Sequence, residues 1–253
     1  MKLNIKEILR HILSKLADFV FTGILCVIIS SVITTSILEN IEVKSQNNRH
    51  MALLSSISIG SNQSWIDENF GTPQFTANKG EYLLCAYTND NFLLQVIYSD
   101  HSVQGYLITA FEEEKIVIRD LPYFFDDGIE LGRFSFYDFP YAPISVTGFV
   151  SNGKSRSLYA ETYYLAMHGN YLNYYIAFLD YGFWKGASEW GFFEESAADD
   201  EMTVDQLSPN ASLILTNRKK SHPNTYGVSV YGLDMEELLF SYDWFDSVKL
   251  ITE

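Results

Sequence analysis

The sequence predicts an α+β protein, in which an N-terminal transmembrane helix is followed by a soluble domain of mostly antiparallel β-sheet with few helices. Three observations support this prediction. Residues 19–38 contain no charged side chain. Beyond them, short segments rich in β-branched and aromatic residues alternate with turn-forming residues, as in an antiparallel sheet. Residues 62–70 carry the start and stop signals of a short helix.

The uncharged run 19–38 is bounded by Asp18 and Glu39. A helix rises about 1.5 Å per residue, so a run of this length spans about 30 Å, the thickness of one hydrocarbon core. A cleaved signal peptide is the alternative, but the run is longer than a typical signal core and no A-x-A pattern follows it. Residues 19–38 are therefore predicted to be an uncleaved transmembrane helix.

The charges that flank this helix predict its orientation. Four basic residues precede it, whereas Glu39, Glu42 and Lys44 stand just after it. The basic residues are Lys2, Lys6, Arg10 and Lys15. Positive charge remains on the cytoplasmic side of a membrane. We therefore expect a single-pass protein of the bacterial inner membrane, with its N-terminus in the cytoplasm and its C-terminal domain in the periplasm.

Residues 1–18 are predicted to form an amphipathic cytoplasmic segment, because their apolar side chains recur at helical spacing and form one stripe. The stripe consists of Ile5, Ile8, Leu9, Ile12, Leu13 and Leu16. This segment either lies along the inner leaflet or extends the transmembrane helix. On the other side of the helix, residues 39–60 are predicted to be a stalk.

The first unit of the domain, residues 61–120, is predicted to be one helix followed by an antiparallel meander. Asn62 is a favourable helix cap, and Gly71 and Pro73 are stop signals, so the helix is expected over 62–70. Short turns rich in Asn, Asp and Ser separate the strands that follow. The strands are expected at 82–88, 92–98, 103–111 and 115–119.

The second unit, residues 121–253, is predicted to be aromatic-rich and β-rich. The proline- and glycine-containing segment 121–150 is the expected boundary between the two units. A hairpin is expected over 159–167 and 171–179, and a second hairpin over 212–217 and 225–231. A helix at 234–240, opened by the cap-like Asp234, and a final strand at 247–252 complete the unit.

One local motif resembles a known class of envelope module. The helix end Phe70-Gly71-Thr72-Pro73 is similar to the Leu-Gly-x-Pro turn of outer-membrane-assembly lipoprotein and β-lactamase-inhibitor-protein-like domains, with Phe in place of Leu. The resemblance covers about 50 residues and implies a helix followed by strands. The lipid-attachment cysteine of lipoproteins is absent, since Cys26 lies within the anchor without a cleavage context.

The chain as a whole resembles an uncharacterised family of single-pass bacterial membrane proteins. The resemblance rests on the anchor, on the turn at 70–73 and on residues 223–228, which read Pro-Asn-Thr-Tyr-Gly-Val. It implies the topology described above and no activity.

No catalytic residue, metal ligand or cofactor site is predicted. The sequence has no phosphate loop, dinucleotide fingerprint, H-E-x-x-H or G-x-S-x-G motif, and its five His residues are scattered. Cys85 lies in an apolar segment and is expected to be a buried core thiol. The formal net charge of −15 argues against a nucleic-acid partner.

Two groups of residues are candidates for binding. Tyrosines crowd residues 159–181, and their amphipathic rings suit recognition of a protein or stacking on the sugars of a cell-wall glycan. Tyr163, Tyr171 and Tyr174 are the predicted ligand-binding residues of this group, although tyrosines also simply cover sheets. Arg218, Lys219 and Lys220 form the second group, which either docks an acidic partner or a lipid headgroup, or is a solvated hairpin tip.

These features favour a membrane-anchored, non-enzymatic binding or sensor protein that is integral to the membrane and has an envelope protein or a cell-wall glycan as its partner. An oligomer is compatible with the sequence. One alternative is a membrane effector of the phage-defence or toxin type, whose transmembrane helix, rich in small residues, oligomerises. The other is an envelope hydrolase, for which Glu161 and Asp180 are the candidate carboxylates.

Overall fold

The computed structural model describes ten segments of the chain. They are residues 49–111, 116–118, 128–139, 143–151, 156–164, 171–180, 218–219, 221–241, 243–244 and 246–248. From His50 onward they belong to one compact unit, His50–Glu253. The predicted segments 1–18 and 19–38, and residues 39–48 of the predicted stalk, lie outside the described residues. Within the described part of the chain, no helix is both long and apolar enough to cross a membrane.

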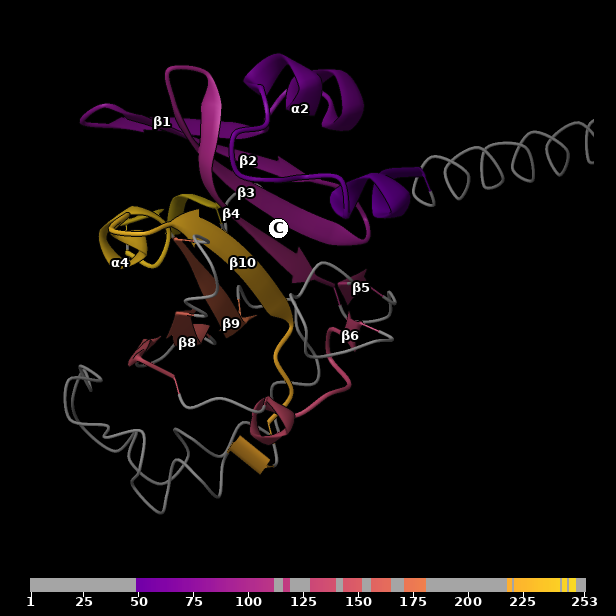
Figure 1. Cartoon of the computed structure of the whole chain (residues 1–253), viewed down its shortest axis with the longest axis vertical. Helices are drawn as coiled ribbons and strands as arrows, with labels where there is room; N and C mark the ends of the chain where they lie inside the picture. Colours follow the sequence, from indigo (N-terminus) through magenta and orange to yellow (C-terminus); the bar gives the residue numbers. More distant parts are fainter. Residues whose placement is uncertain are drawn as a thin grey trace, which may run out of the picture. The chain divides into compact units, whose positions relative to one another are not determined.

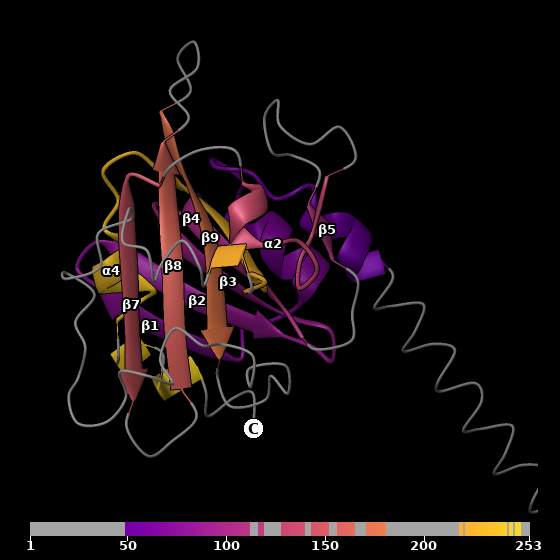
Figure 2. The same cartoon turned by 90° about the horizontal axis from the view of Figure 1, so that it is seen from below.

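An eight-stranded antiparallel sheet dominates this unit, with the strand order β1-β2-β3-β4-β10-β9-β8-β7 (Figure 1; β7 is labelled in Figure 2). Its strands are β1 (Phe75–Lys79), β2 (Tyr82–Thr88), β3 (Phe92–Ser99), β4 (Ser102–Ala110), β7 (Ser145–Ser151), β8 (Arg156–Tyr164), β9 (Leu172–Asp180) and β10 (Thr225–Val230). The prediction of a mostly antiparallel sheet domain with few helices is thus confirmed for the described residues. The strands predicted at 82–88, 92–98 and 103–111 correspond to β2, β3 and β4.

Strand β10 joins the two halves of the sequence into one sheet. It pairs with β4 from Thr225 to Ser229 and with β9 from Thr225 to Val230. Residues 61–120 and 121–253 therefore contribute strands to the same sheet. The predicted hairpin between 212–217 and 225–231 is wrong, because β4 and β9 already occupy both edges of β10. Residues 212–217 themselves lie outside the described residues.

The remaining elements are short. They are helices α2 (Gln63–Phe70) and α4 (Met235–Leu238), the 3-10 helix η1 (Phe136–Asp138) and a separate pair of strands, β5 (Val117–Ile118) and β6 (Ile129–Glu130). Asn62 caps α2 by accepting a hydrogen bond from the Ser64 N–H at 2.8 Å. Gly71 ends α2 with a φ of 86°, in the left-handed region that favours glycine. Asp234 caps α4 in the same way, by accepting from the Glu237 N–H.

Helices α2 and α4 pack on opposite faces of the sheet (Figure 2), and alternate strand residues point to each. On the α2 face, Ile66 and Phe70 pack with the inward residues of the strands and with Phe136 of η1. On the α4 face, Met235, Leu238 and the C-terminal residues cover the sheet. Both faces of the sheet are therefore covered, and most described residues of its central strands are buried.

Two hydrogen bonds fix these layers. On the α2 face, the Tyr87 hydroxyl donates to Asp67 of α2 at 2.8 Å. On the α4 face, the indole N–H of Trp244 donates to the buried Gln95 amide of β3 at 2.6 Å. The prediction of a strand at 247–252 is wrong where it is described, because residues 246–248 are helical and Val248 is buried on the α4 face. A segment that covers a sheet face cannot also extend the sheet.

Gly227 allows β10 to fit between its neighbours. Its Cα partners are Leu107 of β4 and Tyr175 of β9. A Cβ atom at this position would lie 2.3 Å from Leu107 Cδ2 and 2.7 Å from the Tyr106 carbonyl oxygen. Both distances are below van der Waals contact, and the carbonyl belongs to the backbone of β4, so the sheet itself would have to shift.

We therefore expect Gly227→Ala to lower the free energy of unfolding by about 1–3 kcal/mol, as overpacking of a close-packed core does. Urea unfolding of the full chain in detergent measures the change. Gly105→Ala is the matched control and should cost less, because a Cβ atom there would meet only side-chain atoms of Leu233, Ser229 and Met235, at 3.0, 3.2 and 3.3 Å. If both variants unfold at the wild-type urea concentration, the placement of β10 described here is incorrect.

Candidate binding surface

Arg218 does not lie on a solvated tip, as the sequence suggested, but inside the domain. Its side chain is buried, and its Nε lies 2.7 Å from Oε1 of Glu161 on β8. The Nε–H is not aligned for a hydrogen bond to that oxygen, so this contact is an ion pair by distance. The predicted role of Arg218 in partner binding is therefore wrong, because its charge is already used within the domain.

Two tyrosines and a backbone carbonyl complete this buried network. Tyr159 and Tyr163 flank Glu161 on β8, so all three side chains point to the α2 face. The Tyr159 hydroxyl donates to Glu161 Oε1 at 2.6 Å, and the Tyr163 hydroxyl donates to Oε2. Nη2 of Arg218 donates to the carbonyl of Phe136 at 2.9 Å. The network thereby ties residue 218 and η1 to the sheet.

Burial and charge act against each other on this ion pair. Burial raises the pKa of the Glu161 carboxyl above its ordinary value, while Arg218 and the two tyrosine hydroxyls oppose that rise. Burial disfavours the charged form of Arg218, but Glu161 and Tyr163 together outweigh burial, so the pKa of Arg218 is raised. Because an arginine stays protonated in proteins, an ionised Glu161 is the state that neutralises it.

The candidate carboxylate Glu161 and the thiol of Cys85 are both buried. Glu161 is 0% exposed, so a substrate of the hypothesised hydrolase could not reach this carboxylate. Burial raises the pKa of the Cys85 thiol to about 11, which keeps it protonated near neutral pH. Cys85 is thus the core thiol that its apolar segment predicted. The side chain of Asp180, the other candidate, lies outside the described residues.

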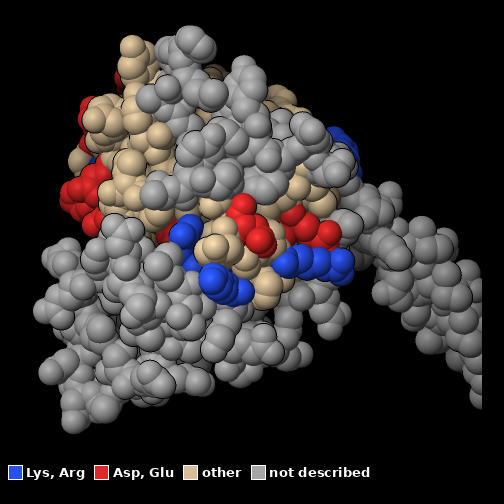
Figure 3. All heavy atoms as spheres, turned by 60° about the horizontal axis from the view of Figure 1, so that its bottom comes forward, with Lys and Arg blue, Asp and Glu red and all other residues tan. Residues whose placement is uncertain are grey.

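Lys219 is exposed, in contrast to Arg218. Its Nζ lies 4.7 Å from the centroid of the Tyr137 ring, in a cation–π contact. The end of the domain that carries η1 and residue 219 comes forward in Figure 3, where acidic and basic side chains lie side by side. Arg133 pairs with Glu130 at 2.8 Å. The partner-binding role of Lys219 stays a prediction, and Lys220 lies outside the described residues.

The three predicted tyrosines have different environments. Tyr163 and Tyr174 are paired across β8 and β9 and are 1% and 4% exposed. These two rings belong to the core of the α2 face, so they are not available to a ligand. Tyr171, which precedes β9, is 68% exposed. The predicted set of Tyr163, Tyr171 and Tyr174 therefore does not form one surface.

A different set of tyrosines does meet at the surface, at the end of the sheet where β8 and β10 finish and β9 begins. The backbone N–H of Tyr231 donates to the carbonyl of Tyr171 at 2.9 Å, which holds the two residues side by side. The rings of Tyr231 and Tyr164 are 5.2 Å apart between centroids. Tyr231 is 63% exposed and Tyr164 is partly buried. We call Tyr164, Tyr171 and Tyr231 the tyrosine cluster.

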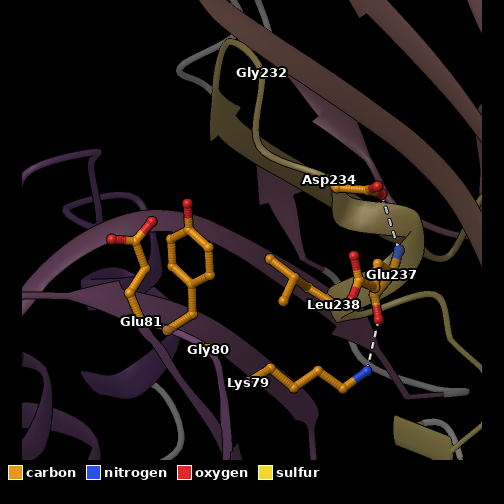
Figure 4. Close-up of a pocket in the computed structure, with 8 residues that line it drawn as sticks. Lys79, Gly80, Glu81, Gly232, Asp234, Glu237 and Leu238 are labelled. Carbon is orange, nitrogen blue, oxygen red and sulfur yellow. Dashed lines mark hydrogen bonds between the residues drawn. The ribbon is translucent and has the colours of Figure 1, made fainter.

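A cavity of about 630 Å³ begins beside the tyrosine cluster, since Gly232 of its lining directly follows Tyr231. The lining comes from the β1–β2 turn and from the segment between β10 and α4. It consists of Lys79, Gly80, Glu81, Tyr82, Gly232, Asp234, Glu237 and Leu238 (Figure 4). The volume lies within the range of about 300–1,000 Å³ that is usual for small-ligand sites.

The carboxylates of this cavity do not converge. Asp234 turns toward the backbone N–H of Glu237, which it caps, and Glu81 lies on the opposite side of the cavity (Figure 4). Lys79 donates to the Glu237 carbonyl at 2.7 Å and to the Ser241 hydroxyl at 2.9 Å. The described residues contain no group of three or more His, Cys, Asp or Glu side chains that could hold a metal ion.

Comparisons with known proteins identify no family for this chain. No family model matches it, and no curated protein matches it. A solved structure with some similarity is a cysteine-rich secretory protein from Staphylococcus aureus, with 10% sequence identity and a TM-score of 0.34. The match covers 72% of this chain and spans 46% of that structure's length.

The buried network makes a quantitative prediction. Arg218→Met leaves the Glu161 carboxylate buried without its counter-charge, and we expect the free energy of unfolding to fall by about 3–5 kcal/mol. Adding Glu161→Gln should restore a large part of this loss, because a neutral amide still accepts hydrogen bonds from the two tyrosines. Urea unfolding of the full chain in detergent measures both. A double variant that is less stable than R218M would contradict the proposed pairing.

Proposed function

We propose that this chain is a membrane-anchored, non-enzymatic binding or sensor protein of the bacterial inner membrane. In this proposal, residues 19–38 anchor it, the N-terminus is cytoplasmic and the sheet domain is periplasmic. The tyrosine cluster is the surface that meets its partner, which is an envelope protein or a cell-wall glycan. The observation that carries the proposal is the exposure of Tyr171 and Tyr231 beside a cavity.

The exposure of these rings is unusual within the domain. Most described tyrosines on the sheet faces are buried and serve the core, as Tyr159, Tyr163 and Tyr226 do. Tyr171 and Tyr231 instead leave more than half of their surface in water, although they stand next to each other. Tyrosine gives a large contact area at a low cost in conformational entropy, which is why it is frequent in recognition surfaces.

The environment of the reactive groups supports a non-enzymatic role. Glu161 is bound by Arg218 and two tyrosines inside the core, and Cys85 is a protonated, buried thiol. In the cavity, Asp234 is used as a helix cap. These groups hold the domain together, whereas a catalytic site needs convergent groups that a substrate can reach.

The binding surface is tested with the full chain in detergent, incubated with purified cell-wall sacculi and, separately, with detergent-extracted envelope proteins. We expect the double variant Y171A/Y231A to retain at least about tenfold less material than wild type, because two interface anchors are lost. Tyr137→Ala is the matched control, since that ring is 52% exposed but lies on η1.

Two outcomes would count against the binding surface. Equal retention by wild type and the double variant would place binding elsewhere on the chain. No retention from either fraction by wild type would remove the binding function itself.

The topology is tested with alkaline phosphatase fused to the C-terminus, because this enzyme is active only after export. The flanking charges predict an active fusion in whole cells. A fusion after residue 18 is the control and should stay inactive. An inactive C-terminal fusion at normal expression would refute the periplasmic placement.

A further inference from the structure

We propose that the partner is a basic peptide segment, whose Lys or Arg side chains stack on the tyrosine cluster and extend into the adjacent acidic cavity. This inference rests on the proposed binding function and narrows it to one chemical class. It depends on three properties: the exposed rings at this end of the sheet, the sign of the charges around the cavity and the net charge of the whole chain.

The rings supply the first property. An aromatic face attracts a cation placed within about 6 Å of its centre, and an exposed contact contributes about 0.5–1 kcal/mol. The domain already contains such a contact, since the Lys219 ammonium lies 4.7 Å from the Tyr137 ring. Tyr171 and Tyr231 offer two more exposed rings, on residues that a backbone hydrogen bond joins. The described residues place no internal cation on either of them.

The cavity supplies the second property. Three of its lining residues, Glu81, Asp234 and Glu237, are acidic, and Lys79 is its one basic residue. Lys79 is also already bonded to the Glu237 carbonyl and the Ser241 hydroxyl. The lining therefore keeps an excess of negative charge next to Tyr231. A guanidinium or ammonium group that extends from the Tyr231 ring into this cavity would enter a lining with a net negative charge.

The charge of the chain supplies the third property. With 17 basic and 32 acidic residues, the chain has a formal net charge of −15. A field of this sign attracts cationic partners over long distances and repels anionic ones such as nucleic acids or acidic polymers. A neutral glycan gains nothing from this field. Charge complementarity therefore favours a basic peptide segment over a neutral glycan, which the tyrosines alone would also accept.

The test measures fluorescence anisotropy of a fluorescein-labelled hexa-arginine peptide with the full chain in detergent at low salt. We expect binding that weakens about tenfold in Y171A/Y231A, as the loss of two cation–π contacts implies. E81Q/E237Q should also weaken it, and E68Q/D90N should not. The last variant removes the same charge from α2 and from the β2–β3 turn, and so controls for net charge.

Each other outcome has a defined meaning. Hexa-arginine binding could fall equally in E81Q/E237Q and E68Q/D90N and stay unchanged in Y171A/Y231A. This result would show attraction to net charge alone and would overturn the inference. Cluster-dependent binding of a labelled N-acetylglucosamine tetramer, without binding of hexa-arginine, would also overturn it but would leave the proposed binding function intact. If Y171A/Y231A binds both probes and the envelope fractions as well as wild type does, both proposals are refuted.

Discussion

The pairing of β10 with β4 on one side and β9 on the other is the interaction on which the rest of the structure depends. It makes one sheet from two distant parts of the chain, and the sheet is covered on both faces. The same pairing brings Tyr231 beside Tyr171, and the segment that follows β10 lines the cavity. The candidate surface thus exists only because β10 is a central strand. Gly227 meets the steric demand of that position.

Local structure could be predicted from the sequence wherever the signal was local. The helix at 62–70 has a cap and a stop signal within the segment, and β2, β3 and β4 are joined by short turns, so neighbours in sequence are neighbours in space. Strand β1 was missed because it is an edge strand whose alternate residues are polar and exposed. The partners of β10 were mispredicted because no local rule specifies a long-range pairing.

The candidate surface illustrates the same limit. The tyrosine-rich stretch pointed to Tyr163, Tyr171 and Tyr174, but strand alternation and two covered faces bury Tyr163 and Tyr174. Tyr231 is remote in sequence and joins Tyr171 only through β10, so no local pattern groups the two residues. Arg218 looked like part of a basic tip, yet a buried Glu161 binds it. A polar residue at an inward position of a β-strand was the one sequence signal for such a partner.

The most direct test of this account is hydrogen exchange of the full chain in detergent, with and without the hexa-arginine peptide. The account predicts that the amides of 225–230 exchange among the slowest in the free protein, since β10 is paired on both edges. It also predicts that the peptide slows exchange chiefly in 79–82 and 231–238. Fast exchange of 225–230, or protection confined to other segments, would contradict the central placement of β10 or the binding surface that depends on it.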